Sequence, residues 1–174
     1  MHILMCNDDG ILADGLRHLA SYLSQYYRIT VVAPANEQSA KSHALTTEVP
    51  LKLDACNGED ENPRLYALTG TPSDCMKFGL SYLLADDMPD LVISGINHGF
   101  NLGSDVLYSG TVSAAMESGF YGIPGLALSV ERYSVERGDE MHPFIHELIE
   151  KIYVAGQFSG LLNVNFPLRG TCDW

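Results

Sequence analysis

The fold is decided at the start of the chain, where residues 2–10 read HILMCNDDG. The first five of these residues form a short, largely apolar run, which predicts a buried strand. A polar loop follows at once, so the run is too short for the apolar region of a signal peptide. We therefore expect a first strand that carries two adjacent carboxylates, Asp8 and Asp9, just beyond its carboxyl end.

Outward from this strand, apolar runs alternate with segments of helical spacing. Strands are expected at 2–6, 28–33, 46–53, 64–69, 90–94, 125–130 and 161–165, and helices at 14–26, 71–84, 111–118 and 142–154. The charged segment 131–140 is expected to be a mobile surface excursion. This alternation predicts an α/β fold in which helices cover both faces of a mostly parallel sheet, joined by right-handed crossovers.

The composition is that of one compact domain, 1–174. The chain has 174 residues, 46% hydrophobic and 18% charged, and a domain usually takes about 100–200 residues. Ten Lys and Arg against 22 Asp and Glu give a net charge of −12, which argues against binding to a nucleic-acid polymer. The net negative charge still allows binding of a small phosphorylated ligand, because backbone N–H groups or a local cation can outweigh the overall charge at short range.

The sequence also predicts the compartment. No apolar run approaches the roughly 18 residues of a membrane span, and Cys6, Cys56, Cys75 and Cys172 form no C-x-x-C pair. We expect a cytoplasmic protein with no membrane partner, no disulfide framework and no zinc site. Cys6 lies in the first apolar run, where we expect a buried thiol.

Polar and glycine-rich sequence gathers in the loops that follow the expected strands, at residues 7–10, 34–42, 70–74 and 94–110. In a parallel sheet these loops share one edge, and ligands bind in the crevice at that edge. The sequence therefore predicts a ligand site built from these four loops.

The Asp8–Asp9 pair supports two interpretations. Two adjacent carboxylates repel each other, and a hard divalent cation held by oxygen ligands would relieve this, with further oxygens from Ser39 and Asn97. Alternatively, one aspartate caps a turn or the following helix, and Gly10 supplies a positive φ.

A second candidate feature is the glycine-spaced stretch 95–105 followed by YSGTVSAA at 108–115. Ser109, Gly110 and Thr111 stand where a helix should begin, so their hydroxyls and N–H groups could bind a phosphate. The alternative is a tight loop with ordinary helix capping. Neither a Walker P-loop nor a G-x-G-x-x-G fingerprint occurs.

The histidines are weaker candidates. His142 and His146 are four residues apart, but no H-E-x-x-H motif is present, and a solvated helix surface is expected. His43 and His98 fall in the expected site loops and are candidate general acids, although a structural, hydrogen-bonded histidine is the favoured interpretation. No G-x-S-x-G motif supports a serine hydrolase.

Taken together, these motifs resemble the SurE family, the survival-protein-E 5'-nucleotidases of bacteria and archaea. The residues that carry the resemblance are NDDG at 7–10, QS at 38–39, GTPSDC at 70–75 and the long motif GINHGFNLGSDVLYSGTVSAA at 95–115. They cover nearly the whole chain in the family's order.

The resemblance implies a Rossmann-like three-layer sandwich and a divalent-metal-dependent phosphatase. In the family one divalent ion per subunit, Mg2+, Mn2+ or Ca2+, is held by residues that match Asp8, Asp9, Ser39 and Asn97. The implied reaction is hydrolysis of nucleoside 5'-monophosphates, with activity on short polyphosphate in some members, by a homodimer or homotetramer. Family members continue beyond an element that matches 161–167 with an exchanged hairpin and a terminal helix, so a C-terminally truncated domain is expected.

The expected chemistry assigns roles to these residues. Asp8 or Asp9 would orient a water molecule or accept its proton, and Asn97, Ser109, Gly110 and Thr111 would bind the phosphate. A water nucleophile and an aspartyl-phosphate route both stay open. Two other functions also stay open: a noncatalytic nucleotide- or phosphate-binding module, and a hydrolase of sugar phosphates or polyphosphate.

Overall fold

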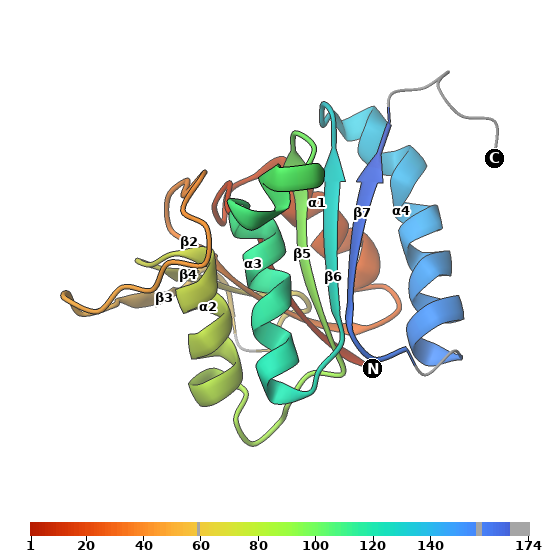
Figure 1. Ribbon diagram of the computed structural model, residues 1–174. Helices are drawn as coiled ribbons and strands as arrows, with labels where there is room; N and C mark the ends of the chain where they lie inside the picture. The colour runs from red at the N-terminus through yellow and green to blue at the C-terminus, as the bar shows by residue number, and fades with distance from the viewer. Residues whose placement is uncertain (59, 156–157, 168–174) are drawn as a thin grey trace.

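A computed structural model describes residues 1–58, 60–155 and 158–167. Within these residues seven strands form one sheet in the order β3-β4-β2-β1-β5-β6-β7 (Figure 1). All of them run parallel except β3, which lies at one edge and is antiparallel to β4. The strands are β1 (His2–Cys6), β2 (Arg28–Pro34), β3 (Leu53–Ala55), β4 (Arg64–Leu68), β5 (Leu91–His98), β6 (Gly125–Val130) and β7 (Leu161–Phe166).

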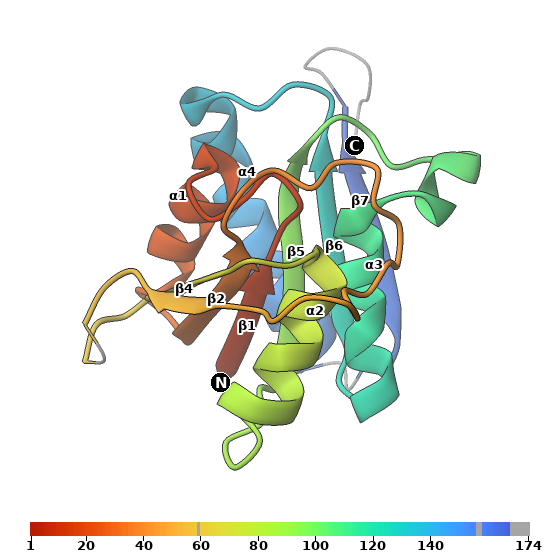
Figure 2. The same ribbon diagram turned by 90° about the vertical axis from the view of Figure 1, so that its left-hand side faces the viewer.

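Helices cover both faces of the sheet. The helices are α1 (Asp14–Leu23), α2 (Pro72–Phe78), α3 (Gly110–Glu117) and α4 (Val135–Ile149). Figure 2 shows α1 and α4 on one face and α2 and α3 on the other. In the described part of the chain, no helix has the length and apolar character needed to cross a membrane.

The two faces of β1 contribute to different cores. Ile3 and Met5 pack in the cluster that includes α1 and α4, whereas Leu4 and Cys6 pack in the cluster that includes α2. This follows from the alternation of side chains along a strand. All four are fully buried, so the expected burial of the Cys6 thiol is confirmed, while Cys172 lies outside the described residues.

The order of the strands places a switch point between β1 and β5. From β1 the chain builds outward through β2 and β4, and it then returns to the other side of β1 to build β5, β6 and β7. The connections from β1 and from β5 therefore leave in opposite directions. This opens a crevice at the carboxyl edge between these two strands, where doubly wound proteins bind ligands.

The expected three-layer α/β fold is confirmed, with local differences. The expected strand 46–53 is wrong over most of its length, because Asp74 accepts hydrogen bonds from the N–H and hydroxyl of Thr46 and holds it away from the sheet. The strand expected at 90–94 continues to His98 past an irregularity in its pairing with β6. The expected excursion 131–140 is wrong in its second half, where Ser134 caps α4.

Gly15 determines how closely α1 approaches β5. A Cβ atom at Gly15 would lie 2.6 Å from the carbonyl oxygen of Ile96, which is backbone and cannot move aside cheaply. Gly119 offers a matched control, because a Cβ there would meet nothing within 4 Å.

We therefore expect Gly15→Ala to lower the free energy of unfolding by about 1–3 kcal/mol, although alanine favours helices, because overpacking displaces the helix. Gly119→Ala should stay within about 0.5 kcal/mol of the wild type. Urea denaturation measures both, and equal effects would contradict the close approach at Gly15.

The expected solvated face for His142 and His146 is wrong for His142. Its side chain is buried, its ring lies 5.2 Å from that of Tyr22, and its Nε2 has no hydrogen-bond partner among residues 1–58, 60–155 and 158–167. The cause is the packing of α4 on α1, which turns this position inward. His146 stays partly exposed and stacks on Tyr26.

Burial lowers the pKa of His142 below its ordinary value of 6.5. The unfolded chain therefore binds a proton more readily than the folded chain once the pH falls below 6.5, so acid destabilises the fold through this residue. Relative to His142→Gln, the wild type should lose free energy of unfolding between pH 7.5 and 5. Denaturation curves of both proteins measure this difference, and parallel pH profiles would contradict it.

Candidate functional site

The loop after β1 turns over the switch point without using either aspartate as a cap. Asn7 shapes the turn, because its side chain exchanges two hydrogen bonds of 3.1 Å with the backbone of Gly10, whose φ is +100°. The residue before α1 is Ala13, which has no capping side chain. The capping interpretation is therefore wrong for α1, and Asp8 and Asp9 are left for another role.

Asp8 lies against the start of α3. Its Oδ1 accepts a hydrogen bond of 2.5 Å from the hydroxyl of Thr111, which is fully buried. A Cβ atom at Gly110 would lie 2.9 Å from the Asp8 Cβ, so a glycine is needed for this approach. Burial raises the pKa of Asp8, and the hydrogen bonds from Thr111 partly oppose that rise.

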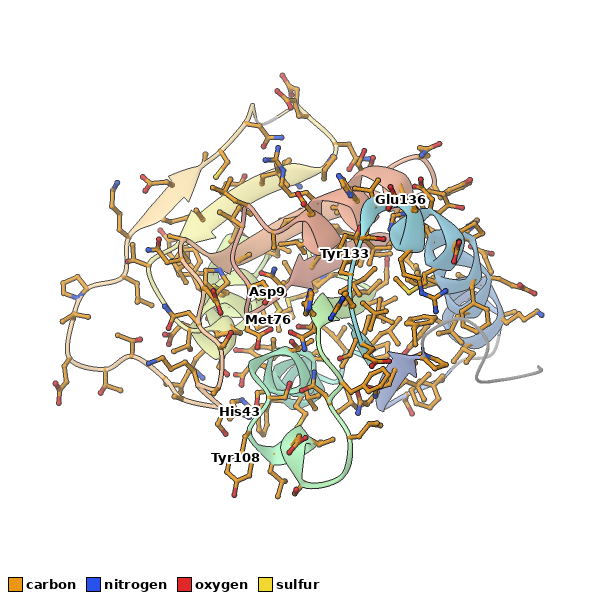
Figure 3. All side chains as sticks on the ribbon, turned by 90° about the horizontal axis from the view of Figure 1, so that it is seen from above. Asp9, His43, Met76, Tyr108, Tyr133 and Glu136 are labelled. Carbon is orange, nitrogen blue, oxygen red and sulfur yellow. The ribbon has the colours of Figure 1, made fainter. Side chains whose placement is uncertain are left out.

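Asp9 is the more accessible of the two carboxylates. Figure 3 looks onto the carboxyl edge and shows Asp9 over the middle of the sheet. Burial and then the neighbouring charge of Asp8 raise its pKa to about 6, while a hydrogen bond from the His98 backbone lowers it. The charge of Glu37 raises the pKa of both aspartates. Negative charge is therefore concentrated at this point of a partly dehydrated site.

Ser39 and Asn97 come to the same edge from two other loops. The backbone N–H of Gln38 donates to the carbonyl of Asp8 at 2.7 Å, which places the loop containing Ser39 beside the aspartates. Ser39 is exposed and donates to Glu37 at 2.7 Å. Asn97 donates from its amide nitrogen to Gly99 at 2.8 Å, so its side-chain oxygen has no hydrogen bond among the described residues.

The start of α3 serves the helix and the site together. Ser109 caps α3, because its Oγ accepts a hydrogen bond of 3.1 Å from the N–H of Val112. The hydroxyl of Thr111 donates a hydrogen bond to Asp8. The capping interpretation is therefore confirmed for Ser109, and the helix N-terminus stabilises a carboxylate through its dipole. Ser109 keeps its hydroxyl proton for another acceptor.

These oxygen atoms fit a hard divalent cation. Among the described residues no three His, Cys, Asp or Glu side chains form a metal-binding group, so a cation would need neutral oxygens besides the two carboxylates. Ser39 and Asn97 offer a hydroxyl and an amide oxygen, which hard cations accept. Burial and then the charge of Asp8 raise the pKa of Asp9, and a bound cation would oppose this rise by favouring the charged carboxylate.

The two histidines of the site loops lie differently. His43 is bound to the buried Glu117 at 2.7 Å, and Figure 3 shows it beside α3, away from the middle of the sheet. The structural interpretation is confirmed for His43. His98 is exposed, and its backbone bonds to Asp9.

A cluster of asparagines outside the predicted site residues fixes the loop after β5. Asn101 is buried, receives a hydrogen bond of 2.8 Å from Asn163 at its carbonyl and donates from its backbone to Asn165 at 2.8 Å. Its side chain donates to Ser129 at 2.8 Å. The signal was available in the alternating LNVN at 162–165, where the two asparagines share one face of a strand.

Asn101→Ala should therefore loosen this loop from β6 and lower the free energy of unfolding by about 1–3 kcal/mol, because the buried Ser129 loses its side-chain partner. The backbone of residue 101 keeps its bonds to Asn163 and Asn165 on β7. Asn57→Ala, which breaks hydrogen bonds in a distant turn, serves as the control. Amide hydrogen exchange of residues 97–102 should rise in the first variant alone. Unchanged exchange in that segment would contradict the role of Asn101.

The fold and the site together define a doubly wound α/β domain with a paired-carboxylate site at its switch point, next to the start of a helix. The family model of survival protein SurE matches residues 3–173, and the chain belongs to this family.

Curated relatives and a solved structure agree with this assignment. A protein of Thermoanaerobacter sp. (strain X514) named 5'-nucleotidase SurE is 49% identical over 168 residues, which are 96% of this chain and 66% of that protein. A protein of the same name from Thermosipho africanus is 45% identical over 172 residues, covering 96% and 65%. The crystal structure of the SurE protein from Aquifex aeolicus has a TM-score of 0.81 and 37% identity, covering 96% and 66%. The chain therefore spans about two thirds of the length of these relatives.

Proposed function

We propose that the protein hydrolyses nucleoside 5'-monophosphates to a nucleoside and phosphate with the help of a divalent cation. The observation that carries this proposal is the Asp8–Asp9 pair at the switch point, with one carboxylate bound to Thr111 and the other partly open to solvent. The matched relatives named 5'-nucleotidase support the same reaction.

The cation would be held by the carboxylates of Asp8 and Asp9 and by oxygens of Ser39 and Asn97. When bound, it supplies positive charge that polarises the phosphoryl oxygens and makes water more acidic. In a protein with a net charge of −12, this local charge also offsets repulsion of an anionic substrate.

The chain's own residues divide the remaining work. Thr111 holds Asp8 in one orientation, so Asp9 is the carboxylate with freedom to orient an attacking water and accept its proton. The hydroxyl of Ser109 and the N–H of Gly110, the first residue of α3, can donate to the oxygens of the phosphate. In the covalent alternative, a carboxylate oxygen of Asp9 attacks phosphorus and the 5'-oxygen of the nucleoside leaves with a proton, after which water hydrolyses the aspartyl phosphate to release phosphate.

Asp9→Asn should lower kcat/KM for nucleoside monophosphates by at least about 100-fold, because it removes the proton acceptor while keeping the side chain's size. EDTA should abolish the activity, and added Mg2+ or Mn2+ should restore it. Phosphate release measures both effects. The control Asp86→Asn changes an exposed carboxylate far from this edge and should keep full activity.

The outcomes separate the candidate functions. Activity that survives both Asp9→Asn and EDTA would contradict the proposal. A folded chain that binds Mn2+ and nucleotide without hydrolysis would support the binding module instead. Labelled phosphate retained on the protein after a single turnover would favour the aspartyl-phosphate route over direct attack by water.

A further inference from the structure

A polar cavity opens beside the paired carboxylates. Its volume is about 320 Å³, and it lies between the loop after β2 and the start of α2. Its lining is made of small apolar, amide and hydroxyl residues: Ala35, Asn36, Gln38, Thr46, Val49, Leu68, Thr69, Gly70 and Thr71. None of these residues carries a charge.

The cavity is joined to the carboxylate site on two sides. On one side, Gln38 donates its backbone N–H to the carbonyl of Asp8 at 2.7 Å. On the other side, the lining residue Thr71 precedes Pro72, whose Cγ would lie 3.2 Å from a Cβ at Gly110. A ligand with its phosphate at the start of α3 can therefore extend directly into the cavity.

Two amide side chains at the cavity are available to a ligand. The side chains of Asn36 and Gln38 make no hydrogen bond among those of the described residues. The hydroxyls of Thr46 and Thr71 are already engaged as donors, to Asp74 and to the carbonyl of Ala44. The hydroxyl of Thr69 accepts a hydrogen bond from the N–H of Lys52. Primary amides both donate and accept hydrogen bonds, as the edge of a nucleobase requires.

The lack of charge in the cavity discriminates between substrate classes. A second or third phosphate group adds negative charge that charged donors bind most strongly, and no lining residue is a cation. A neutral, planar group with hydrogen-bonding edges suits the two free amides and the exposed apolar side chain of Val49. The cavity therefore disfavours polyphosphate as the substrate that fills it.

We propose that this cavity binds the base of the nucleotide, with Asn36 and Gln38 as the residues that recognise its edge. This proposal rests on the proposed function for its choice of ligand. The cavity would be the part of the protein that selects a nucleotide over other phosphate esters.

The first test uses nucleosides, which lack phosphate and do not depend on catalysis. Adenosine, guanosine, cytidine and uridine are titrated into the folded protein while NMR follows the side-chain amides of Asn36 and Gln38. At least one nucleoside should shift both amides saturably, and Asn36→Ala should weaken that binding about tenfold, the equivalent of one hydrogen bond. The matched control is Gln25→Ala, an exposed amide at the opposite end of the sheet.

Absence of a saturable shift with all four nucleosides, an equal response to ribose alone, or unchanged affinity in Asn36→Ala would each overturn the proposal.

The second test compares hydrolysis of nucleoside monophosphates with that of p-nitrophenyl phosphate and tripolyphosphate. Asn36→Ala should lower kcat/KM about tenfold for the preferred nucleotide and leave p-nitrophenyl phosphate unchanged. Equal losses on both substrates would overturn the role in base recognition. If the protein binds nucleosides but releases no phosphate, the proposed hydrolysis is overturned while base binding by the cavity stands. Failure of the proposed function and failure of base recognition can therefore be told apart.

Discussion

The arrangement of the site depends on one contact, the hydrogen bond between Thr111 at the start of α3 and Asp8 after β1. It brings a buried carboxylate to the positive end of a helix, where the dipole and N–H groups stabilise its charge. Asp9 follows in sequence and has no such partner on α3, and burial followed by the charge of Asp8 raises its pKa to about 6. The two adjacent aspartates thus differ in environment, as catalytic carboxylates with different roles commonly do.

The loops around this contact are held by backbone interactions more than by charge pairs. The loop after β2 is attached through the N–H of Gln38 to Asp8, and the loop after β5 is attached through Asn101 to β6 and β7. Gly110 and Gly15 allow helices to approach the site and β5 closely. Backbone support of this kind holds the side-chain oxygens at this edge of the sheet in position.

Local patterns predicted those parts of the molecule that depend on short-range chemistry. The apolar runs of β1 and β5 and the spacing of α1 indicated elements that the structure contains, because burial imposes periods of two and of about 3.6 residues. Where distant contacts compete with the pattern, prediction failed. Thr46 leaves the expected strand because Asp74 binds it, and His142 is buried because α4 packs on α1.

The sequence by itself determined the α/β class, the polar edge of the sheet, and the motifs that indicated the SurE family and an oxygen-ligand site. Only the tertiary structure decided that Asp8 and Asp9 do not cap α1, that Asp8 accepts a hydrogen bond from Thr111, and that Asn36 lines a cavity. The physical reason is separation along the chain. Asp8 and Thr111 are 103 residues apart, and no periodic pattern records which loops a sheet's strand order brings together.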